Sequence, residues 1–336
     1  MAASHPAVRF LAVSDCVPEK ARDLEKKLGA QFSAPDYEQV IRHPEVGAVI
    51  VSTSEDQHAD AAVCALELGI PVLVEKPIAM RIKDADRMIA ASQASGASLR
   101  VGYSRRYLPR YIAIKEQLIQ GRLGRVLGGT ARVYNSRAQL FEILKRCPTA
   151  SPVVDILTYY VDLMLWFLDG NPVREVIARG QAGVIKAAGH DSDDVTWAIA
   201  TLRDGAVVNL GVCYALPAKF PSFGQADRFE LIGVDGVIIS DNDHKDELMV
   251  SEGGVPHFYV PDHTVETVFL NSPTPGEWAL GQFWGPLANE TRAWLDHLAT
   301  GAPCHLTTPE EARQNLEIVF AIEESARTGN PILLSG

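Results

Sequence analysis

The amino-acid sequence predicts a two-domain α/β protein: a parallel-sheet domain, then an α+β domain with a large, mostly antiparallel open sheet. The chain has 336 residues, about twice the length of a typical domain. The first hundred residues alternate short apolar strands with helical stretches, whereas strands with alternating apolar and polar residues dominate after about residue 125. We expect the two domains to span residues 1–104 and 105–336.

The first domain is predicted from strands that are apolar along most of their length, at residues 8–15, 48–53, 71–77 and 98–104. Helices are expected between them at residues 18–29, 56–69 and 83–96, and each of these stretches ends at a glycine. This alternation predicts a parallel sheet covered by helices on both faces. Such sheets bind ligands at the carboxyl ends of their strands, where Asp15, Thr53 and Lys76 stand.

The second domain is predicted from strand patterns within residues 126–135, 174–184, 195–216 and 227–241. The dipeptides Asp204-Gly205 and Asp235-Gly236 are typical of tight hairpin turns, so we expect antiparallel neighbours there. Two helices, at residues 151–170 and 309–329, accompany the sheet.

Composition and charge exclude several function classes. The chain has 31 basic and 42 acidic residues, a net charge of −11, which argues against nucleic acid and polybasic membrane surfaces as partners. No apolar run reaches about 18 residues without a charge, so a membrane span is not expected. Five scattered cysteines without a Cys-x-x-Cys pair, and no signal-like N-terminus, predict a cytoplasmic protein.

The sharpest local motif is Glu75-Lys76-Pro77, directly after an apolar strand. A charged pair at the edge of a buried sheet is costly unless it is matched or used in chemistry. A solvated strand end is the alternative interpretation.

The surrounding sequence resembles the glucose–fructose oxidoreductase/inositol dehydrogenase (Gfo/Idh/MocA) family. In that family a strand ending in a small hydroxylated residue is followed by His, an Ala-rich helix, Gly, a strand and Glu-Lys-Pro. The matching positions in residues 51–80 are Thr53, His58, Gly69 and Glu75-Lys76-Pro77. The resemblance continues through residues 101–126 and the C-terminal helix, and so covers nearly the whole chain.

The resemblance implies a Rossmann-like first domain and NAD(P)-dependent hydride transfer from a secondary alcohol of a sugar, cyclitol or related polyol. Lys76 would hydrogen-bond the reacting oxygen, where a cation stabilises alkoxide character. The cofactor site implied by the resemblance comprises Asp15, Ser52, Thr53, His58, Glu75, Lys76 and Arg106.

A second set of candidate catalytic residues is Asp155 and Tyr159, four apart on one face of a predicted helix. Many members of the family have Asp and His here, with His as the base. A phenol with a pKa of about 10 is a poor base alone, but a nearby Lys ammonium favours the phenolate. We therefore expect Lys76, Asp155 and Tyr159 to be catalytic, and these three with Arg146 to bind substrate. Alternatively, Asp155 caps the helix and Tyr159 is a core aromatic. Ser151-Pro152 replaces the family's usual Gly-Gly before the Asp.

The cofactor preference follows from Asp15 at the end of its strand. A carboxylate there accepts bonds from both ribose hydroxyls and repels a 2′-phosphate, which favours NAD, with NADP as the alternative. A merely solvated or capping Asp15 is the other interpretation. The acidic stretch His190–Asp194 has no partner His or Cys at useful spacing, so no metal is predicted.

There are two alternative functions, and an oligomeric assembly is expected. A net non-redox reaction through a transient keto intermediate would use tightly held NAD, and a sugar- or NAD-sensing protein of this fold would have no turnover. The second-domain sheet has a broad apolar face that relatives use to pair subunits, so we expect a homodimer or homotetramer.

No glycine-rich turn precedes any predicted strand, and the first glycine is Gly29. The resemblance implies such a turn near the N-terminus, where its amides would hold the cofactor pyrophosphate. We expect that about 20–25 native residues precede Met1, the length of one strand–turn–helix unit, and that without them NAD binds weakly. The coding frame upstream of Met1 tests this expectation.

Overall fold

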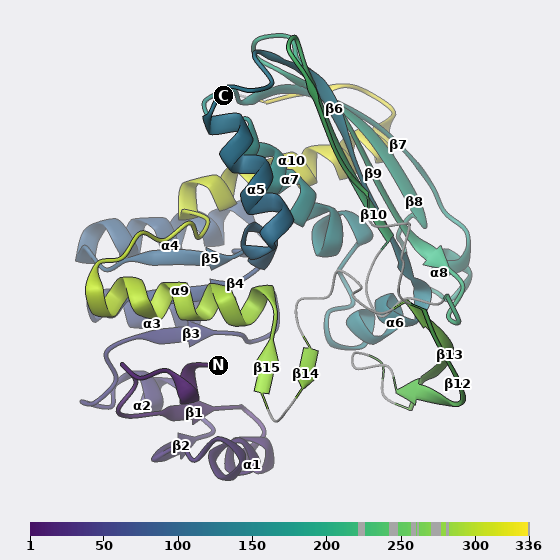
Figure 1. Ribbon diagram of the computed structural model, residues 1–336. Helices are drawn as coiled ribbons and strands as arrows, with labels where there is room; N and C mark the ends of the chain where they lie inside the picture. Colours follow the sequence, from purple (N-terminus) through teal and green to yellow (C-terminus); the bar gives the residue numbers. More distant parts are fainter. Residues whose placement is uncertain are drawn as a thin grey trace. The chain divides into compact units, whose positions relative to one another are not determined.

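The computed structural model (Figure 1) describes residues 1–220, 226–241, 248–256, 260, 262–269, 277–279 and 282–334. The chain forms two compact units. The first comprises Met1–Tyr107 and Gly276–Arg313, and the second comprises Leu108–Pro275 and Gln314–Gly336. The chain passes from the first unit to the second after Tyr107, close to the predicted boundary after residue 104. Residues 276–313 belong to the first unit, although the sequence predicts them in the second domain.

The first five strands, β1 to β5, pair in parallel, as predicted. β3 (Val49–Val51), β4 (Val72–Glu75) and β5 (Leu99–Gly102) form one sheet in the order β3-β4-β5. β1 (Ala12–Ser14) and β2 (Phe32–Ala34), the latter not predicted, form a separate two-stranded sheet. Within the described part of the chain, no ladder joins β1 to β3.

Helices follow the strands at nearly the predicted places. Those of the first unit are η1 (Ala2–Ser4), α1 (Pro18–Leu28), α2 (Tyr37–Ile41), α3 (His58–Glu67), α4 (Ile82–Ser95), η2 (Ser104–Tyr107) and α9 (Pro286–Thr300). The unit also contains the short hairpin of β14 (Glu277–Ala279) and β15 (Gln282–Trp284). Gly29 and Gly96 end α1 and α4 with positive φ values of 65° and 73°, a conformation that glycine adopts without strain.

Helix α9 belongs to the first unit because it covers one face of the β3-β4-β5 sheet. Successive side chains of a strand face opposite sides, and Leu73 of β4 packs against Trp294 and Leu295 of α9. Val72 and Val74 point to the other face and are fully buried. β4 is therefore apolar and covered on both sides.

The second unit is built on a seven-stranded sheet in the order β11-β10-β6-β9-β8-β7-β16. Its strands are β6 (Val126–Ser136), β7 (Val173–Gln181), β8 (Val195–Leu202), β9 (Val207–Leu216), β10 (Ala226–Gly233), β11 (Val237–Asp241) and β16 (Ile332–Leu333). Neighbours are antiparallel except β6 and β9, which confirms the prediction of a mostly antiparallel sheet. Both predicted hairpins form, β8–β9 around Asp204-Gly205 and β10–β11 around Asp235-Gly236.

The helices of this unit differ from the prediction, because α5, α6 and α8 are not predicted and the first predicted helix is divided. They are α5 (Pro109–Ile119), α6 (Arg137–Arg146), η3 (Val153–Leu157), α7 (Thr158–Phe167), α8 (Val184–Ala187) and α10 (Pro309–Thr328), whose residues from Gln314 onward lie here. A small hairpin joins β12 (Leu248–Pro256) and β13 (Thr264–Phe269). The stretch predicted as one helix over 151–170 is a π-helical turn, η3, followed by α7. In the described residues, no helix is long and apolar enough to cross a membrane.

A buried carboxylate ties α5 and α7 to the sheet. Asp227 of β10 is 1% exposed and accepts hydrogen bonds from Tyr160 of α7 (2.5 Å), Tyr111 of α5 (3.2 Å) and Arg110 Nη2 (2.9 Å). The rings of Tyr111 and Phe167 also pack against Phe229, two residues after Asp227 in β10. Figure 1 shows α5 and α7 on the same side of the sheet.

We expect Asp227→Ala to lower the free energy of unfolding by about 3 kcal/mol, because it leaves a guanidinium and two buried hydroxyls without their acceptor. Urea unfolding followed by circular dichroism measures the change. Asp169→Ala, at an exposed position after α7, is the matched control and should change stability by less than about 0.5 kcal/mol. A loss below about 1 kcal/mol for Asp227→Ala would contradict this assignment.

Candidate active site

The carboxyl ends of parallel strands bring the first group of predicted residues to one sheet edge. Ser52 and Thr53 follow β3 and are exposed. Glu75 ends β4 and Lys76 follows it, both half-buried. Because β3 and β4 pair in parallel, these residues stand at the same edge of the sheet.

His58 lies between the segments that follow β3 and β4. Its ring is 1% exposed, with Nδ1 2.9 Å from the Pro77 carbonyl oxygen and Nε2 3.2 Å from the Thr53 carbonyl oxygen. Burial lowers the pKa of His58, and the Lys76 ammonium adds to this, whereas the two carbonyls and Glu55 oppose it. A neutral imidazole carries one N–H, so it donates to one of the two carbonyls. His58 thus joins the segment after β3 to the turn that carries Lys76.

Electrostatic interactions link Glu75 with the Lys76 ammonium and with the Glu55 carboxylate. Burial raises the pKa of Glu75, the Lys76 ammonium opposes that rise, and the neighbouring Glu55 carboxylate adds to it. Glu55 is itself buried. Of the two interpretations of the Glu-Lys-Pro motif, the solvated strand end does not fit this partly buried arrangement of charges.

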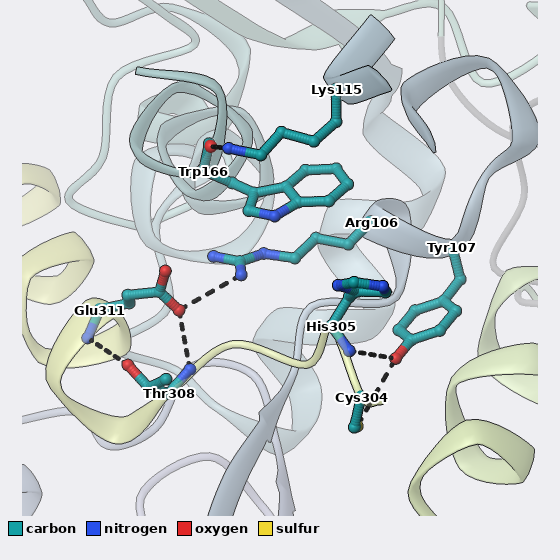
Figure 2. A network of polar contacts seen from close by, with 8 residues as sticks. All are labelled: Arg106, Tyr107, Lys115, Trp166, Cys304, His305, Thr308 and Glu311. Carbon is teal, nitrogen blue, oxygen red and sulfur yellow. Dashed lines mark hydrogen bonds and ion pairs between the residues drawn. The ribbon is translucent and has the colours of Figure 1, made fainter. Parts of the chain in front are cut away.

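Asp15 and Arg106 lie elsewhere in the first unit. Asp15 follows β1, in the two-stranded sheet, and its Oδ1 accepts a bond from the Val17 amide (2.9 Å) just before α1. Arg106 is 3% exposed, and its Nη1 donates to Glu311 Oε2 at 3.2 Å (Figure 2). Glu311 and Thr308 bond reciprocally through side chain and amide at the start of α10, a capping box. Arg106 therefore supports the beginning of a helix.

In the second unit, Asp155 lies within the π-helical turn. The Thr158 amide reaches back to the Val153 carbonyl, which defines this wider turn. Asp155 is 7% exposed, and its Oδ2 accepts a 2.5 Å hydrogen bond from the Tyr214 hydroxyl of β9. Ser151 Oγ, and not Asp155, caps the segment, because it accepts from the Val154 amide at 3.1 Å. The capping alternative for Asp155 is thus wrong.

Tyr159 begins the second turn of the same segment and is half-buried. It lies near Tyr214, whose pKa burial raises well above its ordinary value; the negative charge and hydrogen bond of Asp155 raise it further, and Tyr159 adds to the rise. A hydrogen bond from Asn135 of β6 opposes the shift. The side chain of Arg146, the last residue of α6, lies outside the described residues.

The sequence analysis does not single out Tyr214 or Asn135. The alternation in β9 places Leu210, Val212 and Tyr214 on its buried face. That pattern is the one signal for Tyr214, and it gives no indication that Asp155 is the partner of this hydroxyl.

The acidic stretch before β8 has a structural role. The Asp194 carboxylate accepts bonds from the amides of Gly183, Val184 and Ile185, at 3.1, 2.6 and 2.9 Å. No group of three or more His, Cys, Asp or Glu side chains in the described ranges is arranged to hold a metal ion. That a metal plays no part stays a prediction.

Comparisons with known proteins identify the family of both parts of the chain. Residues 1–103 match the oxidoreductase family's NAD-binding Rossmann fold, and residues 111–239 match the GFO/IDH/MocA C-terminal domain. The chain is 27% identical to myo-inositol 2-dehydrogenase of Thermotoga maritima, over 69% of this chain and 67% of the relative. It is 28% identical to inositol 2-dehydrogenase of Acidothermus cellulolyticus, over 68% of this chain and 64% of the relative. The matches therefore span about two thirds of these relatives' length.

The fold is also similar to that of a solved structure, scyllo-inositol dehydrogenase from Lactobacillus casei with bound NAD(H) and scyllo-inositol. The TM-score is 0.79, with 18% identity over 99% of this chain and 94% of the other. At this identity the likeness shows the fold alone.

We expect the stability of the protein to fall below about pH 6.5, partly through His58. Its pKa is lowered in the folded state, so the unfolded chain binds a proton first as the pH falls. The stability that the neutral ring contributes is complete above the pKa of His58 in the unfolded chain. It is lost as the pH falls below that pKa, at up to about 1.4 kcal/mol per pH unit. The difference in unfolding free energy between about pH 7 and pH 5, measured with urea, should be smaller for His58→Gln. His305→Gln, at an exposed histidine, is the control, and its unfolding free energy should depend on pH as that of the wild type does. An equal pH dependence of the unfolding free energy in all three proteins would contradict the expectation.

Proposed function

We propose, from the premise that this chain belongs to the Gfo/Idh/MocA family of oxidoreductases, that it oxidises a secondary alcohol of a cyclitol, sugar or related polyol with NAD. The observation that carries the proposal is the Lys76 ammonium at the carboxyl end of β4, beside the strand end that carries Ser52 and Thr53. The names of the inositol dehydrogenases among its relatives support a polyhydroxylated substrate.

The residues at this edge fit the nicotinamide end of NAD. Ser52 and Thr53 are exposed hydroxyl residues at the carboxyl end of a parallel strand, the usual place for a dinucleotide. His58, Glu75 and Arg106 would shape this unit around the cofactor, and Asp15 would accept the ribose hydroxyls and favour NAD over NADP. When bound, NAD supplies the hydride acceptor.

Residues of the chain would accept the proton of the alcohol and stabilise the charge on its oxygen. Lys76 would donate a hydrogen bond to the reacting oxygen and stabilise its developing negative charge. Tyr159 would take up the hydroxyl proton, and Asp155 would orient the substrate or Tyr159. Tyr214 would hold the Asp155 carboxylate through their 2.5 Å hydrogen bond. Arg146, by resemblance, would contribute to substrate binding.

A panel of inositols, sugars and glycosides, with NADH formation followed by absorbance, tests the proposal. Stoichiometric NADH and a ketone product are expected with at least one member. An isomerised or eliminated product without net NADH would identify the non-redox alternative, and binding without any turnover would identify a sensor.

We predict that Lys76→Ala lowers kcat by about a hundredfold or more while the affinity for NAD stays within about tenfold, because the lost cation acts on the developing alkoxide. Steady-state kinetics and NAD titration measure the two effects. Lys83→Ala, an exposed lysine of α4, is the matched control and should behave as the wild type. A near-normal rate for Lys76→Ala would remove Lys76 from the mechanism.

Tyr159→Phe should lower kcat by about a hundredfold or more, the usual contribution of a general acid–base group. It should also remove the alkaline limb of the pH–rate profile. Tyr37→Phe, at another half-buried tyrosine, is the control. If Tyr159→Phe stays active and Asp155→Asn does not, Asp155 is the base.

We also propose that the open sheet face pairs two copies of the chain. Register places Ile199 of β8 and Ile239 of β11 in one row across the sheet, with Val207 and Val237 in a neighbouring row on the same face. All four are at least 44% exposed. Large exposed apolar side chains gathered on one sheet face are typical of subunit interfaces.

Ile199→Glu combined with Ile239→Glu should therefore produce monomers in sedimentation equilibrium, where the wild type sediments as a dimer or tetramer. Leu68→Glu, at an exposed apolar residue of the first unit, should leave the assembly unchanged. A monomeric wild type would refute this part of the proposal.

A further inference from the structure

The segment that carries Asp155 is held at both ends by one helix, α10. At its beginning, the Ser151 hydroxyl donates to Glu323 Oε1. At its end, the Thr158 hydroxyl donates to Asn315 Oδ1 at 2.8 Å, and Asn315 Nδ2 donates to the Thr158 carbonyl at 2.8 Å. The π-helical turn Val153–Leu157 lies between these two attachments.

The attachments have the properties of a rigid support. Asn315 and Thr158 are 0% and 1% exposed, so each of their two mutual bonds satisfies groups that water does not reach. Asn315 and Glu323 are eight positions apart on α10, about 12 Å along a straight helix and close to the same face. A π-helical turn is rare and is frequently found at functional sites. The bonds from α10 support this turn at both of its ends.

The supported turn is also the part of the chain that presents Asp155. Within it, Asp155 receives the short hydrogen bond from Tyr214, and Tyr159 follows directly after Thr158. A shift of the turn by a fraction of an ångström would change both the Asp155–Tyr214 bond and the direction of Tyr159.

We propose that Asn315 and Glu323 are positioning residues, which act through the π-helical turn on Asp155. The proposal rests on the function proposed above for Asp155 and Tyr159.

The first measurement does not require turnover. A short hydrogen bond such as that of Tyr214 with Asp155 gives a downfield proton resonance, which Tyr214→Phe identifies by its loss. We expect this resonance to be shifted or lost in Asn315→Leu and in Thr158→Val, which removes only the Thr158 hydroxyl. It should be retained in Thr158→Ser and in the control Glu324→Gln, at an exposed residue of α10. A wild-type spectrum without the resonance, or one unaltered in both test variants, overturns the proposal.

The second measurement uses the alcohol that the wild type oxidises. Asn315→Leu and Thr158→Val should lower kcat by about tenfold with the KM for NAD unchanged, and Thr158→Ser should restore the rate. If Asn315→Leu does not fold, as judged by its thermal transition, Thr158→Val and Ser151→Ala decide the matter. Unchanged kcat in folded variants overturns the positioning role. A wild type that oxidises no alcohol refutes the proposed function instead, and the resonance still decides whether α10 controls Asp155.

Discussion

Burial of β4 on both faces is the constraint on which the first unit depends. Val72, Leu73 and Val74 are enclosed between layers of helices, so charged residues can follow only where the strand leaves the sheet. That edge is where Glu75 and Lys76 stand. Parallel pairing with β3 brings Thr53 to the same edge, and the His58 ring lies between the Thr53 and Pro77 carbonyl groups. The position of the Lys76 ammonium thus follows from the way the sheet is covered.

Two buried carboxylates of the second unit have different surroundings. Asp227 and Asp155 are both buried carboxylates that accept tyrosine hydroxyls. Asp227 also has the Arg110 guanidinium, in regular structure, and joins helices to the sheet. Asp155 instead lies in a π-helical turn and accepts an equally short bond from Tyr214. The two carboxylates therefore differ in the guanidinium and in the backbone around them, not in the length of the tyrosine bond.

Membership of the Gfo/Idh/MocA family relates the chain to NAD-binding oxidoreductases, whereas the residues of this chain give it particular features. Tyr159 stands where the resemblance implies a histidine, and a phenol needs more help than an imidazole to accept a proton. The supports around it are correspondingly elaborate. Asn315 and Glu323 hold the turn before Tyr159, and Tyr214 holds the carboxylate four residues earlier.

The sequence by itself determined the elements that local patterns mark, although β2, α2, α5, α6 and α9 are not among those predicted. Pro18 at the beginning and Gly29 at the end mark α1, Gly96 ends α4, alternation with Asp-Gly turns marks the β8–β9 and β10–β11 hairpins, and Glu-Lys-Pro at the end of β4 marks the sheet edge. Only the tertiary structure decided which distant residues meet. Helix α9 joins the first unit because Trp294 packs on Leu73, Arg106 pairs with Glu311, and Tyr214 bonds Asp155. The π-helical turn belongs here too, because its supports come from Asn315 and Glu323, far along the chain. Periodicity reports the face on which a side chain lies, but the partner on that face is set by packing between segments, which no local pattern encodes.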